Sequence, residues 1–219
     1  MNSKINEFII VSLLVLGVII AVVGATFSWL AVSRNNNYIS GSTSSFNATL
    51  SIEPIKTGNL IPVVDSSMLT SLNGSYPCVD SRSNDYSLCS IYKVTVTNRG
   101  MATEFNGYVE TNSATSYIAN VNSNLRYQLF THDTNYTAVS DIGVMNTTSG
   151  SKNYLKLSNN NISISLNDGT SSVTQREYYL VIWLHDTNNN QLDDANKSYS
   201  GSLVFETLNG GRISSTFTS

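Results

Sequence analysis

The sequence has few charged residues. Asp, Glu, Lys and Arg make up 12% of its 219 residues, and the formal net charge is -3 at pH 7. A protein that binds nucleic acid through the phosphates needs clustered lysines and arginines, and this chain has no such cluster. The same lack argues against adhesion to a membrane through a polybasic surface. We therefore expect no nucleic-acid partner.

Histidine, cysteine and the common catalytic motifs are also scarce or missing. The chain has two histidines, His132 and His185, and two cysteines, Cys78 and Cys89, which are too few and too widely spaced for a typical zinc site. Each histidine opens the sequence His-Asp-Thr-Asn, which is typical of a polar turn after a strand. HExxH, G-x-S-x-G and P-loop patterns are absent from the sequence. We predict no enzymatic activity, no catalytic residue and no cofactor.

Asn, Ser, Thr and Tyr are abundant instead, and 12 residues are tyrosine. These residue types favour strands and turns over helix interiors. Alternating apolar residues predict short strands at 46–53, 90–98, 104–111, 116–121, 125–132, 153–158, 161–169, 176–185, 197–208 and 211–219. We therefore expect residues 46–219 to form an all-β, jelly-roll-like two-sheet β-sandwich, preceded by an N-terminal hydrophobic helix.

Two parts of this domain depart from simple alternation. Residues 178–184, YYLVIWL, are apolar on both faces, which predicts a central strand in a sheet covered on each side, or a barrel wall with an occupied interior. Residues 54–89 contain all three prolines and are expected to be irregular. No amphipathic helix is expected outside the N-terminal apolar run.

The N-terminus carries an uncharged apolar run from Phe8 to Val32. We interpret residues 1–30 as an export segment, either a signal peptide cleaved after the small residues 23–25 or a membrane anchor through residues 8–30. Residues 31–45 are a polar arm that is too hydrophilic to fold alone. The rest of the chain is expected at the cell surface or outside the cell, where Cys78 and Cys89 would form a disulfide.

The segment 186–197 resembles the start of a calcium loop. Asp186, Asn188 and Asn190, with Asp194 further on, have side-chain oxygens at suitable spacing. However, Gln191 stands where the loop needs glycine, and Lys197 stands where it needs a bidentate glutamate. The alternative is the polar connection of a β-hairpin, which this pattern favours.

Four stretches together resemble the TasA/camelysin-like family of secreted biofilm-fibre proteins, which is related to archaeal bundling pilins. They are ATFSWLAVS (25–33), FNATLSIE (46–53), YKVTVTNRG (92–100) and YYLVIWLHDTNNNQLDDANKSYSGSLVF (178–205). The last resembles a family signature in which an apolar strand, a polar loop and a return strand follow one another. The resemblance implies that a hairpin connection is built by Trp183, Leu184, Gln191, Asp194, Lys197, Tyr199 and Gly201.

The resemblance also implies a function: self-association into extracellular fibres by donor-strand exchange. In that mechanism the N-terminal arm of one subunit pairs with an open sheet edge of the next. The candidate residues that would fill the acceptor groove are Trp29, Leu30, Val32, Tyr38 and Ile39. The metalloendopeptidase activity attributed to some members is not implied, since no zinc motif is present. The alternative is a membrane-anchored monomeric domain that binds glycans or other cells.

Overall fold

The computed structural model describes residues 48–73, 77–79, 86–98, 104–115, 121–157, 160–161, 163–165, 174–194, 197–207 and 210–218. The predicted export segment, the polar arm and its five candidate groove-filling residues lie outside these ranges, as does most of the predicted strand 116–121. None of the helices in these ranges has the length and apolar character needed to cross a membrane.

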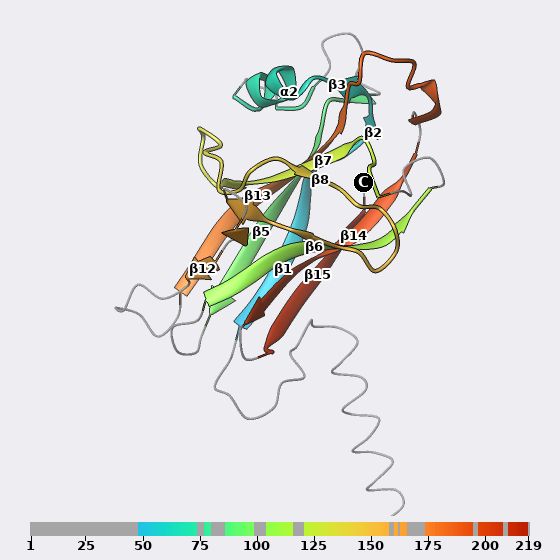
Figure 1. Ribbon diagram of the computed structural model, residues 1–219. Coiled ribbons are helices and arrows are strands. Elements are labelled where there is room, and N and C mark those ends of the chain that lie inside the picture. The colour runs from blue at the N-terminus through green and yellow to red at the C-terminus, as the bar shows by residue number, and fades with distance from the viewer. Residues whose placement is uncertain are drawn as a thin grey trace, which may run out of the picture. The chain divides into compact units, whose positions relative to one another are not determined.

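The larger of two main sheets has the strand order β1-β5-β13-β7-β8, with every neighbouring pair antiparallel. The strands are β1 (Ala48–Lys56), β5 (Ser90–Asn98), β13 (Thr174–His185), β7 (Leu125–Thr131) and β8 (Gly143–Val144). A short strand, β3 (Pro62–Val63), pairs in parallel with the end of β13. Figure 1 shows β13 in the middle of this sheet.

The smaller sheet has the order β12-β6-β14-β15, and β9 pairs with the same edge of β6 as β12. Its strands are β12 (Ser163–Ser165), β6 (Glu104–Ala114), β14 (Tyr199–Thr207), β15 (Arg212–Thr218) and β9 (Lys152–Tyr154). Two small ladders join β2 (Asn59–Leu60) to β4 (Tyr86–Ser87) and β10 (Lys156–Leu157) to β11 (Asn160–Asn161).

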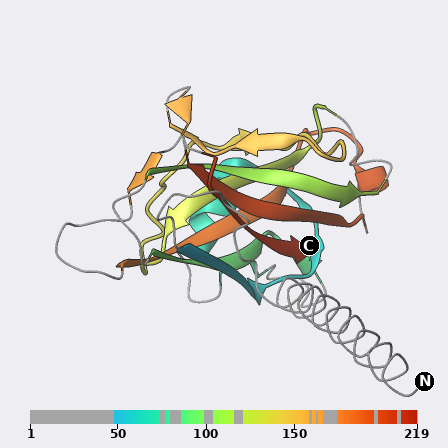
Figure 2. The ribbon, with the colours of Figure 1, turned by 90° about the horizontal axis from the view of Figure 1, so that it is seen from below.

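One apolar core lies between the two main sheets, which form two layers in Figure 2. Strand β5 turns Tyr92, Val94 and Val96 into this core, while β14 contributes Leu203 and Phe205. This alternation is the two-residue periodicity of a strand, and it was visible in the sequence. The prediction of an all-β, sandwich-like fold is confirmed.

A second apolar cluster covers the outer face of the larger sheet. Val181 and Trp183 point to this side from β13 and pack against Met68 and Leu72 of a short helix, α2 (Asp65–Leu72). The prediction that residues 178–184 form a central strand covered on both faces is confirmed. No amphipathic helix was expected after the N-terminal run, but the short helix α2 is present and buries one face. Helix α2 buries only two side chains four residues apart and is rich in Ser and Thr, so its sequence carries little helical pattern.

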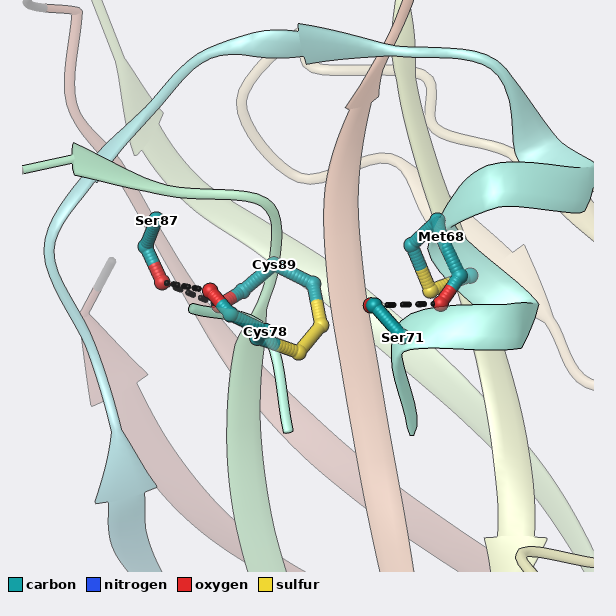
Figure 3. The surroundings of a disulfide bond; sticks show 5 residues. All are labelled: Met68, Ser71, Cys78, Ser87 and Cys89. Carbon is teal, nitrogen blue, oxygen red and sulfur yellow. Dashed lines mark hydrogen bonds between the residues drawn. A yellow bond between two sulfur atoms is a disulfide. The ribbon is translucent and has the colours of Figure 1, made fainter. Parts of the chain in front are cut away.

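The predicted disulfide between Cys78 and Cys89 is present, with a Cα–Cα separation of 5.0 Å. Both cysteines are fully buried in the second cluster. Figure 3 shows the Ser87 hydroxyl beside the disulfide, 3.1 Å from the Cys78 carbonyl oxygen and 2.8 Å from that of Cys89. The disulfide thus fastens the segment between β1 and β5 against the outer face of the larger sheet.

The predicted hairpin between 176–185 and 197–208 was wrong. Strand β13 pairs with β5 on one side and β7 on the other, while β14 pairs with β6 and β15 in the smaller sheet. Both edges of β13 are therefore occupied within the larger sheet. The connection from residue 186 to residue 198 crosses from one sheet to the other.

Candidate functional site

Two seams lie where the edges of the two sheets meet. The first seam lies between β1 and β15, which are the terminal strands of their sheets and run side by side (Figure 1). The second seam lies on the opposite side, between β8 and β9. An unpaired strand edge exposes backbone N–H and C=O groups that can pair with another strand. The seams are therefore the candidate sites for strand addition.

A tyrosine bridges the two sheets across the first seam. Tyr92 of β5 donates its hydroxyl hydrogen to the carbonyl oxygen of Thr218 in β15 at 2.6 Å, and its ring lies 4.8 Å from that of Phe217. A cavity of about 240 Å³ opens here, lined by Ile52 and Pro54 of β1 together with Phe217 and Thr218. Tyr92 pairs with Pro54, in the C-terminal half of β1, and bonds Thr218, at the C-terminal end of β15. The C-terminal halves of these two strands therefore lie at the same end of the seam.

A second tyrosine bridges the second seam in the same way. Tyr127 of β7 donates its hydroxyl hydrogen to the carbonyl oxygen of Tyr154 in β9 at 2.7 Å. Residue 143 is glycine because any Cβ there would overlap the Tyr127 ring. A cavity of about 340 Å³ lies beside this bond and is lined by side chains that include Val144, Lys152 and Lys156.

Burial keeps both bridging hydroxyls protonated. Burial raises the pKa of Tyr92 to about 12 and raises the pKa of Tyr127 as well. The ionised form of a phenol is poorly solvated in such a site. Both groups therefore remain hydrogen-bond donors throughout the neutral range.

The crossover from 186 to 198 is tied down by Gln191 and Asp194, two of the residues predicted to shape this connection. The Gln191 side chain accepts a hydrogen bond from the Thr187 amide at 2.8 Å and donates one to the His185 carbonyl at 2.9 Å. Asp194 accepts a hydrogen bond from the Asn124 side chain at 2.8 Å. These contacts attach the crossover to the end of β13 and the start of β7.

The other predicted connection residues are dispersed. Trp183 and Leu184 lie in different clusters on opposite faces of β13, and Lys197 is half-buried. Tyr199 enters the main core, where its hydroxyl lies 3.4 Å from Thr111 Oγ1. A Cβ at Gly201 would lie 2.8 Å from the Tyr199 hydroxyl oxygen and 3.0 Å from the Glu110 carbonyl oxygen, so this site requires glycine.

The calcium-loop candidates already have protein partners. Asp186 accepts a hydrogen bond from the Asn188 amide at 2.8 Å, and Asn188 adopts a left-handed φ of 58°. This is the local bonding of an Asx turn. Within the residues that the structure describes, no group of three or more His, Cys, Asp or Glu side chains is placed to hold a metal.

We predict that calcium leaves the stability of the protein unchanged. Asp186 already accepts a hydrogen bond from the Asn188 amide within the loop, and Asp194 accepts one from the Asn124 side chain outside it, so calcium would have to displace those bonds. Thermal unfolding in about 2 mM calcium and in excess EDTA should give the same Tm. A ligand that binds only the native state raises Tm, so a calcium-dependent increase would contradict this prediction.

One polar cluster was not foreseen from the sequence. Asp65 Oδ1, at the start of α2, lies 2.8 Å from Trp183 Nε1 and 2.8 Å from His185 Nδ1. The partners are more than a hundred residues apart in the chain, and neither forms a local motif. This cluster anchors α2 to the end of β13.

An aromatic patch lies on the outer face of the larger sheet, formed by His132, Tyr136 and Tyr179. The Tyr136 and Tyr179 rings stack with centroids 5.0 Å apart, and His132 lies 4.6 Å from Tyr179. Tyr136 has a left-handed φ of 46°, which is unusual for a bulky residue. Glu177 connects this patch to Lys93, with an ion pair of 2.9 Å to Lys93 and a contact of 3.2 Å to His132 Nδ1.

The chain matches no protein-family model and no curated protein. The resemblance to the TasA/camelysin-like family therefore remains a prediction from the four sequence stretches.

Proposed function

We propose that this protein is a structural subunit of the cell surface or extracellular matrix that polymerises into fibres. Each subunit would be a jelly-roll-like sandwich, and the N-terminal arm of one copy would add a strand to the sandwich of the next. The partner is thus a second copy of the same chain. No enzymatic activity and no cofactor form part of this proposal.

The observation that carries the proposal is the pair of unpaired edges at the first seam. In the described part of the chain, no strand pairs with the outer edge of β1 or of β15. Natural proteins usually cover or blunt such edges because they invite pairing with other chains. Here, β1 follows directly on the N-terminal part of the sequence that contains the predicted arm.

The length of the arm fits this role. Residues 31–45 provide about 15 residues, which span roughly 50 Å when extended. Strand β1, with 9 residues, is about 30 Å long at the rise of a β-strand. The arm can therefore pair with a whole edge strand of a neighbour and still leave residues for a linker.

The export segment sets a condition on assembly. A cleaved signal peptide would free the arm for donation, whereas a retained anchor through residues 8–30 would restrict the subunit to the membrane surface. The N-terminal sequence of the exported protein distinguishes these two forms. A mature chain that begins near Thr26 fits the free arm.

Deletion of the arm provides the test of this function. We expect the exported protein to form fibres visible by negative-stain electron microscopy, and a variant that lacks residues 31–45 to remain monomeric, because no donor strand is left. Circular dichroism and thermal unfolding of the variant should match those of the intact domain. Fibres of normal length from the folded deletion variant would contradict the proposal.

The aromatic patch favours an alternative function, a monomeric surface domain that binds glycans. Tyr136 and Tyr179 present rigid rings, and the ion pair with Lys93 and the contact with His132 hold Glu177 in place. Tyrosine gives large contact area at a low cost in conformational entropy. Under this alternative, the exported protein would remain a full-length monomer, and Tyr136→Ala would abolish its binding to cells.

A further inference from the structure

We infer that the first seam, between β1 and β15, is the acceptor for residues 31–45 of a second copy, and that Tyr92 is the latch that holds this seam closed in the free subunit. This inference rests on the proposed function and adds the location and the control of strand exchange. The second seam, between β8 and β9, is the alternative within the same molecule.

The lengths of the bordering strands favour the first seam. Strand β1 has 9 residues and β15 has 7, and both are terminal strands of their sheets. Strand β8, by contrast, has only 2 residues. An added strand gains affinity from a row of backbone hydrogen bonds, so it needs a long template. The second seam offers too short a template for the arm.

A backbone hydrogen bond already closes the second seam. The Asp141 amide, just before β8, donates a hydrogen bond to the Lys156 carbonyl, just after β9, at 2.7 Å. The bond from Tyr127 to the Tyr154 carbonyl provides a second link. At the first seam, the bond from the Tyr92 hydroxyl to the Thr218 carbonyl oxygen links the two sheets.

The chemistry of the first seam suits an alternating strand. Its cavity has apolar walls from Ile52 and Phe217, and the hydroxyl-bearing Thr216 lies at its rim. A strand places every second side chain on the same face. Leu30, just before the polar arm, and Val32, at its start, are spaced by two, so both can point into this cavity while the rest of the arm continues along the edge.

Tyr92 controls access to the first seam because its hydroxyl bonds the Thr218 carbonyl oxygen. The Thr218 carbonyl belongs to β15, so the Tyr92 hydroxyl occupies an acceptor that an incoming strand would use. Insertion of the arm then requires this bond to break or to shift. Loss of the hydroxyl should make insertion easier without changing the apolar walls, since a phenylalanine ring keeps the packing against Phe217.

Two matched variants test the latch. Tyr92→Phe and Tyr127→Phe each remove one hydroxyl that bridges the sheets, at 2.6 and 2.7 Å respectively, but at opposite seams. We expect Tyr92→Phe to shorten the lag phase of fibre formation about fivefold, the factor that corresponds to one neutral hydrogen bond. Tyr127→Phe should leave the lag unchanged. Equal lag phases in both variants and the wild type would contradict the role of the Tyr92 hydroxyl in holding the first seam closed.

Photo-crosslinking tests the location independently. A photoreactive phenylalanine at position 39 of the arm should crosslink, in the fibre, to residues 48–56 or 212–218 of another copy. Crosslinks to residues 141–157 instead would place the acceptor at the second seam and overturn this inference, while the proposed fibre function would stand. If the exported protein forms no fibre at all, both this inference and the proposed function fail. Failure of the acceptor location alone can therefore be distinguished from failure of the proposed function.

Discussion

Replacement of Trp183 by alanine is expected to lower the free energy of unfolding by about 3–5 kcal/mol, which is the usual cost of removing a fully buried Trp ring. Trp183 is completely buried in the second apolar cluster and donates a hydrogen bond to Asp65 at 2.8 Å. Its loss leaves a cavity between α2 and β13 and removes one of two donors to the Asp65 carboxylate. For a domain of this size, Tm should fall by roughly 10 °C.

A matched control separates burial from a general effect of substitution. Val144, in β8, is 50% exposed, so Val144→Ala should change stability by less than about 0.5 kcal/mol. The loss of stability in Trp183→Phe should lie between those of Trp183→Ala and Val144→Ala, because phenylalanine keeps an aromatic ring but loses the hydrogen-bond donor to Asp65. Urea unfolding of the three variants provides the measurement. A loss below about 1 kcal/mol for Trp183→Ala would show that the outer face of the larger sheet is not covered.

Stability is expected to collapse between pH 10 and pH 12 as tyrosines ionise. Burial raises the pKa of Tyr92 and of Tyr199 from 10.0 to about 12 in the folded protein. In the unfolded chain these groups ionise near 10, so their contribution is fully present below pH 10 and is lost as pH rises through 12. Each of these increases in pKa corresponds to roughly 3 kcal/mol, so the two tyrosines together should remove on the order of 6 kcal/mol.

Absorbance at 295 nm, which reports tyrosinate, should rise together with the loss of the β-sheet circular dichroism signal. Tyr199→Phe should retain more of its stability at high pH, because one buried ionisable group is gone. A gradual titration near pH 10 that is complete before the protein unfolds would contradict the burial of these hydroxyls in the core.

Local sequence pattern was enough to predict the long strands of the two main sheets, although it missed the short strands β2, β3, β4 and β8. The strand predicted at 90–98 coincides with β5, because each alternate residue from Tyr92 to Val96 had to face one core. The doubly apolar stretch 178–184 likewise fixed the central position of β13. These features depend on neighbours two residues apart, which a single sequence displays.

Features that depend on distant partners could not be predicted. Helix α2 is held by Met68, Leu72 and the Asp65 contacts with β13, and none of these gives a strong helical pattern. Consecutive strands joined by a short polar loop usually form a hairpin, which led to the wrong partner for β14. Neither seam was foreseen, since Tyr92 and Thr218 are 126 residues apart.

Amide hydrogen exchange of assembled fibres, compared with the monomeric variant that lacks residues 31–45, tests strand donation most directly. If the neighbour's arm lies in the first seam, amides in β1, β15 and the arm itself should exchange more slowly in the fibre, whereas β8 should not change. Equal exchange of β1 and β15 in both samples, or an arm that is already protected in full-length monomer, would contradict the account.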